Sequence, residues 1–291
     1  MDKILLTGKT GFIGRNIQEM NNGKDEWFAP NSRELDVSNE AQLGHYILEY
    51  KISKIVHTAV FNHHNLAPQE ELYRNVQMTM NMHKVASAVD RVIILGSGAE
   101  YAKEYDIVKV KEEEIGKHIP TSVYGLSKYL QQMIIGQSAN LYNLRLFGVY
   151  GPYEDWKKRF ISNLCCKAMF DLELTIRQNA RFSYLSVADL VTSIDIVLHS
   201  PKIQYHDYNV VPTDSISLLE IANMVNDIAE KKLPIRLFEP GFQKEYTGSG
   251  ERFQTEFSPC FQDYKTGIAQ LYQWYLDHKN QIDLAVLKET R

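Results

Sequence analysis

Short apolar runs alternate with longer amphipathic stretches along the first half of the chain. The apolar runs predict strands at residues 4–7, 26–29, 54–59, 91–95 and 141–147. The stretches between them predict helices over about 14–23, 38–50, 68–89 and 122–138, with Ser38 as an N-cap. Leu72, Val76 and Met80 fall on one face of the third helix. This alternation predicts an α/β fold with a doubly wound parallel sheet and right-handed crossovers.

After Gly151 and Pro152 the alternation is less regular. The pattern predicts helices at 156–170 and 187–199, strands at 174–176, 184–186 and 208–211, and a last helix from Tyr264. Ser217 and Glu220 form a capping box that opens a further helix. We expect 208–211 to return to the sheet. One domain then comprises residues 1–150 and about 187–211, and a smaller α/β region comprises 151–186 and 212–291, with a cleft between them.

Composition narrows the class of protein without identifying it. The chain has 291 residues, 44% hydrophobic and 23% charged, which is typical of a globular protein. Its net charge of −4 argues against general affinity for nucleic acid or acidic membranes. The N-terminus leads directly into a strand, and no apolar run approaches the roughly 20 residues of a membrane span. We therefore expect a cytoplasmic protein.

The cysteines give no sign of a metal site. Cys165 and Cys166 are adjacent, Cys260 is distant, and no Cys or His spacing suggests zinc. We expect all three to be small buried hydrophobes in a reducing compartment, and we predict no metal ligand.

A glycine-rich loop joins the first strand to the first helix. Gly8, Gly11 and Gly14 give G-x-x-G-x-x-G in the first βαβ unit. Such glycines allow a tight turn, close approach of a pyrophosphate and close packing of helix on strand, and the helix N-terminus offers free N–H groups to phosphate. The loop predicts dinucleotide binding in a Rossmann domain; the alternative is a tight turn without a ligand.

The end of the second strand indicates which dinucleotide is bound. No carboxylate stands where NAD-binding proteins hold the adenosine ribose, and Ser32 and Arg33 follow instead. An arginine can hold a 2′-phosphate with two parallel hydrogen bonds. The residues favour NADP over NAD, unless Arg33 is a solvated loop residue paired with Glu34.

Three residues carry redox chemistry. Ser97 ends the fourth strand, and Tyr124 and Lys128 lie four apart on the next helix, so they share a face. A phenol can give the proton that hydride transfer to a carbonyl requires, a nearby ammonium can stabilise the phenolate, and a serine can polarise the carbonyl. The alternative is a surface tyrosine and lysine without a catalytic role.

Together these residues resemble the extended short-chain dehydrogenase/reductase family of NAD(P)-dependent nucleotide-sugar epimerases, dehydratases and reductases. The likeness covers nearly the whole chain, and GDP-fucose synthase-like 4-keto reductases are the most similar group. It rests on TGKTGFIG, YGLSK, Asp36 with Val37, Thr58 with Ala59, and the Arg145-to-Pro152 segment. The cofactor-binding residues that the loop and the resemblance imply are Gly8, Thr10, Gly11, Phe12, Ile13, Gly14, Ser32, Arg33, Asp36, Val37, Thr58, Ala59 and Lys128.

Departures from the family pattern restrict the reaction. Family dehydratases carry Asp-Glu after the catalytic serine or threonine, where this chain has Gly98 and Ala99. Glu100, in an expected extended segment, points to the other side. The family's C3/C5 epimerising Cys and His correspond to Ala99 and approximately Arg159. We therefore expect neither dehydration nor C3/C5 epimerisation.

The match to the family pattern is weaker in the segments expected to bind the substrate. The family's Asn before Tyr-Gly-Pro is Gly148, and the arginine of its diphosphate segment is displaced by one residue. The substrate-binding candidates are Ala99, Arg159, Arg177, Arg181 and Arg252. We expect solvated loops at His63–Asn65 and at residues 109–114, and core packing for the aromatic residues of the last helix.

The sequence therefore predicts a homodimeric, NADPH-dependent reductase of the 4-keto group of a nucleotide-linked deoxysugar, with Tyr124, Lys128 and Ser97 as catalytic residues. Two alternatives stay open. One is a nucleotide-sugar 4-epimerase that retains NAD, and the other is a non-catalytic NADP-sensing protein.

Overall fold

A six-stranded parallel sheet is the centre of the fold. The computed structural model describes residues 1–61 and 67–290 of the chain. In spatial order the strands are β11 (Asp207–Asn209), β6 (Leu141–Leu146), β4 (Arg91–Ser97), β3 (Lys54–His57), β1 (Lys3–Thr7) and β2 (Glu26–Phe28). The predicted doubly wound parallel sheet is confirmed, and residues 207–209 return to it as expected.

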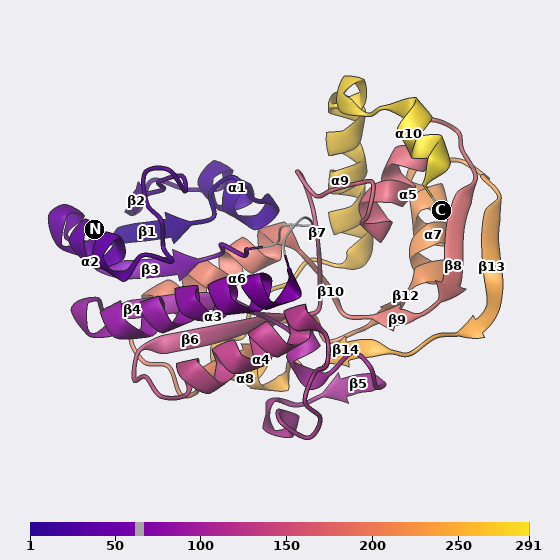
Figure 1. The fold of residues 1–291 in the computed structure, drawn as a ribbon. Helices are drawn as coiled ribbons and strands as arrows, with labels where there is room; N and C mark the ends of the chain where they lie inside the picture. Colours follow the sequence, from indigo (N-terminus) through magenta and orange to yellow (C-terminus); the bar gives the residue numbers. More distant parts are fainter. Residues whose placement is uncertain (62–66, 291) are drawn as a thin grey trace.

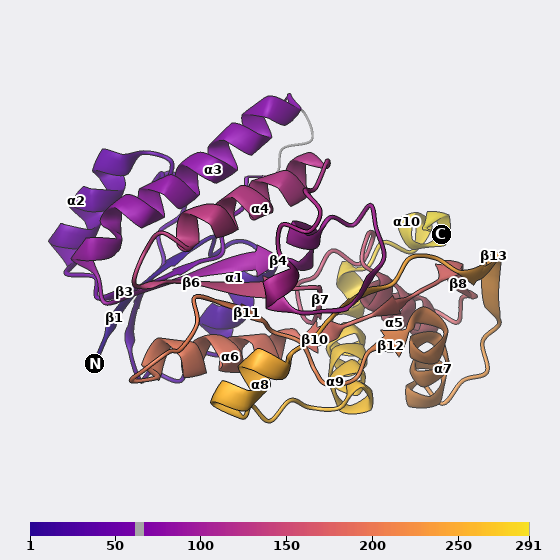
Figure 2. The ribbon, with the colours of Figure 1, turned by 90° about the horizontal axis from the view of Figure 1, so that it is seen from below.

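Helices cover both faces of this sheet (Figure 2). One face carries α2 (Glu40–Tyr50), α3 (Pro68–Val85) and α4 (Val123–Ile135), and the other carries α1 (Phe12–Glu19), α6 (Val187–His199) and α8 (Glu251–Phe257). Successive strand residues point to opposite faces, so Leu5 and Ile94 pack under the first layer while Ile4 and Ile93 pack under the second. The sheet is therefore buried on both sides.

Several helix ends differ from the predicted ones. The N-cap of α2 is Asn39, whose side chain accepts a 3.1 Å hydrogen bond from the Gln42 amide, because the Ser38 hydroxyl donates to Asp36 instead. Helix α3 ends at Val85 and is followed by the 3₁₀ turn η1 (Ala86–Ala88). Helix α5 (Phe160–Met169) begins four residues later than predicted, after Arg159.

The rest of the chain forms a second group of elements beside the sheet (Figure 1). It contains α5, α7 (Leu218–Ile228), α9 (Tyr264–Asp277) and α10 (Leu284–Glu289), the turn η4 (Lys279–Gln281), and the strand pair β8 (Leu174–Asn179) and β13 (Ile235–Phe242). The capping box of α7 is confirmed, and Tyr272 and Tyr275 lie in the core. Cys165 and Cys166 are buried as expected, but Cys260 is exposed, so that prediction was wrong for Cys260.

Short strands join the two groups. The strands β12 (Ile216–Ser217), β9 (Arg181–Phe182), β14 (Tyr246–Gly248) and β5 (Ile107–Val110) form one sheet, and β7 (Gly148–Tyr150) pairs with β10 (Tyr184–Ser186). Residues 109–114 are thus not simply a solvated loop: they include the end of β5 and the turn η3 (Glu112–Glu114). Glu112 is buried because its carboxylate accepts a hydrogen bond from the Asn209 amide.

The predicted division into two regions stays an interpretation. Phe253 of α8, from the second region, packs into the core beneath the six-stranded sheet. In the part of the chain that the structure describes, no helix is both long and apolar enough to cross a membrane.

Candidate active site

The glycine loop lies where the strand order reverses, between β1 and β3. Gly8 has a φ of +80°, and a Cβ there would lie 2.7 Å from the Ala59 amide nitrogen. A Cβ on Gly14 would lie 2.2 Å from the Gly8 carbonyl oxygen, so only glycine lets α1 start this close to β1. Ligands of doubly wound sheets bind at such switch points, outside the carboxyl ends of the strands.

A cavity of about 540 Å³ opens at this point. Its wall includes eight of the predicted cofactor-binding residues: Gly8, Thr10, Gly11, Ser32, Asp36, Val37, Thr58 and Ala59. Phe12, Ile13 and Gly14 form the first turn of α1, directly after the loop. The cavity joins a helix N-terminus to the space beyond β2 and β3, so the residues present fit a dinucleotide.

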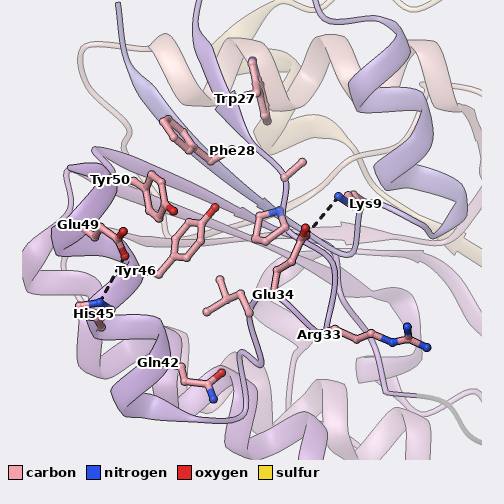
Figure 3. A pocket seen from close by; sticks show the side chains of 13 residues that line it. Lys9, Trp27, Phe28, Arg33, Glu34, Gln42, His45, Tyr46, Glu49 and Tyr50 are labelled. Atoms are coloured by element: carbon pink, nitrogen blue, oxygen red, sulfur yellow. Dashed lines mark ion pairs between the residues drawn. The ribbon is translucent and has the colours of Figure 1, made fainter.

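Arg33 lies at a neighbouring cavity of about 620 Å³ (Figure 3). The Glu34 carboxylate faces Lys9 at 3.6 Å, and Arg33 extends away from it. The structure therefore does not show the alternative in which Arg33 pairs with Glu34. Sequence reasoning missed two cations of the main cavity, Lys9 and Arg74; Lys9, inside the glycine motif, could have been found from its position alone.

The three predicted catalytic residues meet between β4 and α4. The Ser97 hydroxyl accepts a hydrogen bond from the Ala99 amide at 3.2 Å and interacts with the Tyr124 phenol. Lys128 is buried, and its Nζ donates to the Leu95 carbonyl at 2.7 Å and to Gln131 at 3.2 Å. The N-cap Ser122 fixes the start of α4 and thereby sets the height of Tyr124 on the helix.

Their surroundings set the protonation states. Burial raises the pKa of Tyr124, while Ser97 and the charge of Arg159 act against that rise; even so, 38% of the Tyr124 surface is exposed. Burial lowers the pKa of Lys128 to about 8, although the Glu100 carboxylate opposes this. At neutral pH the phenol is thus protonated and the ammonium is mostly charged.

The buried Glu100 carboxylate holds the Ser97 backbone in place. Residues Gly98–Tyr101 form the turn η2, not the expected extended segment. The turn directs the Glu100 carboxylate back to the Ser97 amide at 2.9 Å and to Arg145, which also binds Asp207 at 2.7 Å. Glu100 and Arg145 are completely buried, so this pair holds the end of β4 to β6.

Aromatic rings occupy the places of two family side chains. A Cβ on Gly98 would lie 2.6 Å from the Phe147 ring, and a Cβ on Gly148 would lie 2.5 Å from the Tyr184 ring. The first position carries an acid in the resembling dehydratases and the second carries the family's Asn. In this chain Phe147, between β6 and β7, and Tyr184 of β10 take up the space at these positions.

The five substrate candidates are not all near Ser97. Ala99 is buried beside it and lies against Gly125 of α4. Arg159 affects the pKa of Tyr124 and of Lys103, so it lies near both; its guanidinium has no hydrogen bond or ion pair within residues 1–61 and 67–290. Lys103, which sequence reasoning missed, stands 4.1 Å above the Tyr246 ring.

The other three substrate candidates, all arginines, have partners within the protein, and their role as substrate contacts stays a prediction. Arg177 is 83% exposed on β8 at the far edge of the molecule and pairs with Glu239 (Figure 1). Arg252 binds Asp207 at 2.8 Å and also binds Glu113, so carboxylates already neutralise it. Arg181 donates to the Ser215 carbonyl and pairs with Glu220 at the start of α7.

The expectations for the His63–Asn65 loop and for metal ligands concern other parts of the chain. His63–Asn65 lies outside the described residues. Asp2, Asp25 and His199 lie close together. The Lys54 ammonium binds Asp2, and His199 hydrogen bonds to Asp25 at 2.9 Å, so these side chains already have partners within the protein.

The fold and the site define a doubly wound α/β protein with a glycine loop at the switch point of its sheet and a Tyr-Lys pair on α4. The model of the NAD dependent epimerase/dehydratase family matches residues 4–210. The chain therefore belongs to this family of NAD(P)-dependent enzymes.

Individual relatives agree with this assignment. GDP-L-colitose synthase of Yersinia pseudotuberculosis is 34% identical over 111 residues, 36% of this chain and 36% of that protein. The match thus spans only about a third of that relative's length. GDP-L-fucose synthetase of Naegleria fowleri, bound to NADP, superposes with a TM-score of 0.83 at 15% identity, over 96% of this chain and 94% of that one. The Bordetella bronchiseptica enzyme WbmG, bound to NAD and UDP, superposes with a TM-score of 0.80 at 21% identity, over 94% of each chain. At these identities the superpositions establish the fold.

Proposed function

We propose that the protein reduces the 4-keto group of a nucleotide-linked deoxysugar with NADPH. The observation that carries the proposal is the placement of Ser97 at the carboxyl end of β4, with Tyr124 near it and Lys128 bound to β4 from the same helix face. The neighbouring strand β3 leads into Thr58 and Ala59 of the dinucleotide cavity. When bound there, a reduced nicotinamide supplies the hydride. Tyr124 gives its proton to the carbonyl oxygen, Ser97 donates a hydrogen bond to the same oxygen, and the Lys128 ammonium stabilises the phenolate that remains.

The protonation states support reduction. A reductase needs a protonated phenol at the start of each turnover, and the raised pKa of Tyr124 keeps it protonated at neutral pH. The raised pKa also leaves little phenolate at neutral pH, which is less suited to the 4-epimerase alternative, where the same group must first accept a proton.

The surroundings of Ser97 support a reaction without dehydration or C3/C5 epimerisation. Position 98 has no room for a dehydratase acid because Phe147 fills it, and the Glu100 carboxylate is turned toward Arg145. Ala99 and Arg159 offer no group that shuttles protons at neutral pH. Arg159 brings positive charge close to Tyr124, as an anionic nucleotide sugar requires, and Lys103 lies near Arg159.

The basic residues beyond β2 support NADP as the cofactor. Arg33 has no ion pair among the described residues, and Lys9 lies between the two cavities. A 2′-phosphate between them would gain charge-assisted hydrogen bonds.

The first test is to denature the purified protein, identify any released dinucleotide by mass spectrometry, and titrate the apoprotein with NADPH and NADH. We expect little retained cofactor and tighter binding of NADPH. The Arg33→Ala variant should bind NADPH about tenfold more weakly, the loss expected for one charge-assisted hydrogen bond, and should leave NADH binding unchanged. Arg177→Ala is the matched control, since Arg177 is an exposed, paired arginine far from the cavity.

Turnover is then measured as NADPH oxidation with GDP-, UDP- and dTDP-linked 4-keto-6-deoxyhexoses. Oxidation with one of them supports the reductase. Stoichiometric, non-exchanging NAD in the purified protein would overturn the proposal in favour of the 4-epimerase, and the role of Arg33 with it.

A further inference from the structure

Tyr246 carries a buried hydroxyl without a partner. It lies on β14, its side chain is buried, and its Oη has no hydrogen-bond partner anywhere in residues 1–61 and 67–290. Buried phenol hydroxyls usually find a partner, and an exception in a native structure calls for an explanation. No part of the proposed hydride transfer described above uses this group.

The hydroxyl lies beside Gly98, the residue that follows the candidate catalytic serine. A Cβ on Gly98 would come within 2.8 Å of the Tyr246 Oη. Burial raises the pKa of Tyr246 well above its usual value, so the phenol remains a donor. Ser97 is close enough to lower that pKa, although the two hydroxyls lack the geometry of an ordinary hydrogen bond. Tyr124 affects the pKa of Tyr246 as well, so both phenols lie near Ser97.

The Tyr246 ring cannot turn its hydroxyl elsewhere. It packs against Phe147 with ring centres 5.0 Å apart and against Phe182 at 5.9 Å, edge to face. Lys103 covers the ring from a third direction at 4.1 Å. These contacts fix the ring and hold its hydroxyl beside Gly98, the residue that follows Ser97.

We propose that Tyr246 is a positioning residue that donates to Ser97 Oγ and thereby directs the Ser97 proton toward the substrate carbonyl. A serine hydroxyl has one proton and two acceptor lone pairs. The Ala99 amide occupies one lone pair at 3.2 Å. In this proposal the Tyr246 hydroxyl donates to the other. The remaining direction is the one in which Ser97 donates, toward Tyr124 and the substrate oxygen. Catalytic hydrogen bonds are often long in structures without ligand and tighten in the complex.

This inference rests on the proposed function for its kinetic consequence, but its decisive test does not need turnover. The variant is Tyr246→Phe, which keeps the ring and removes only the unpartnered hydroxyl. In protein labelled with [¹³Cζ]tyrosine, the Tyr124 signal is assigned with Tyr124→Phe and followed against pH by NMR. Because Ser97 donation lowers the pKa of Tyr124, we expect the Tyr124 titration to move to higher pH in Tyr246→Phe.

Stability separates positioning from a structural role. Tyr246→Phe removes only a contact with Ser97 that lacks ordinary hydrogen-bond geometry, so its thermal midpoint should stay close to that of the wild type. Tyr208→Phe is the control: its hydroxyl donates to Glu256 at 2.7 Å and accepts from the Tyr205 amide, so this variant should melt lower with an unchanged Tyr124 titration. An unmoved Tyr124 titration in Tyr246→Phe would overturn the inference.

Turnover adds a second readout that also tests the proposed function. With a 4-keto sugar that the wild type reduces, Tyr246→Phe should lower kcat about tenfold to a hundredfold and leave the KM for NADPH unchanged, as expected for a misoriented donor. If the wild type reduces none of the keto sugars, the proposed function fails, and the NMR titration still decides the role of Tyr246.

Discussion

At the scale of single residues, Lys128 combines a chemical role with an energetic cost. Its ammonium is buried beneath β4, where two hydrogen bonds replace water. Its pKa is lowered from 10.5 to about 8, which corresponds to a penalty of about 3 kcal/mol for the buried charge. Groups whose pKa is strongly shifted often lie at functional sites, where stability is given up for activity.

Replacing Lys128 by methionine should therefore separate activity from stability. We expect kcat of Lys128→Met to fall at least about a hundredfold, because the phenolate loses its stabilising charge. Below pH 8 the variant should be as stable as the wild type or more stable. Between pH 8 and 10.5 the unfolded wild type keeps a proton that the folded wild type loses. The stability of the wild type therefore rises, and the difference in stability between variant and wild type shrinks. Urea unfolding at several pH values measures this.

A second buried lysine provides the control. Lys167 of α5 is also buried, with a pKa lowered by burial, and its Nζ donates to the Thr290 carbonyl at 2.8 Å. Lys167→Met should leave hydride transfer unchanged. Wild-type turnover from Lys128→Met would remove Lys128 from the mechanism.

At the scale of elements, the contact between α1 and β1 shapes the cofactor cavity. The first turn of α1 passes so close to the loop that a side chain at position 14 would meet the Gly8 carbonyl. Phosphate binding at a helix N-terminus depends on that close approach, because it brings the free N–H groups to the ligand. The distance between these two elements should thus control affinity for the dinucleotide.

We expect Gly14→Ala to weaken NADPH binding at least about tenfold and to lower stability, because the new Cβ forces α1 away from the loop. Isothermal titration and urea unfolding measure the two effects. Gly44→Ala in α2 is the control: nothing lies within 4 Å of its Cβ position, and alanine should stabilise that helix by about 0.5–1 kcal/mol. Wild-type affinity in Gly14→Ala would show that the close approach is not needed.

At the scale of the whole molecule, α3 and α4 lie side by side on an outer face of the sheet (Figure 2). Leu72, Val76 and Met80 do not form the buried face of α3; its buried residues are Met78, Thr79, Asn81, Met82 and Val85. Met80 is 42% exposed and Tyr73, seven residues before it, is 63% exposed. Apolar side chains that one copy leaves exposed on a long helix are suited to contact with a second copy.

We expect the protein to be a homodimer that associates through this face. Sedimentation equilibrium should give twice the 33.6 kDa mass of one chain, and Met80→Asp should shift the equilibrium to monomers by burying a charge in the interface. Leu48→Asp, at an exposed apolar residue of α2, should remain dimeric. A single 33.6 kDa species at micromolar concentration would rule out the dimer.

The sequence by itself determined the sheet, the glycine loop and the spacing of the redox residues, because each depends on local patterns. Apolar runs mark strands, and G-x-x-G-x-x-G between strand and helix requires a close approach. Tyr124 and Lys128 share a helix face through their spacing alone. These features need no knowledge of what lies across the molecule.

Only the tertiary structure decided which distant side chains surround Ser97. Arg252 and Arg159 look alike in sequence, but Asp207 and Glu113 neutralise the first, while the second stands free near Tyr124. Tyr246 reaches Gly98, next to Ser97, from a strand about 150 residues later, and no local pattern predicts that approach. Periodicity specifies the face on which a side chain lies; its neighbours across the fold depend on how the elements pack.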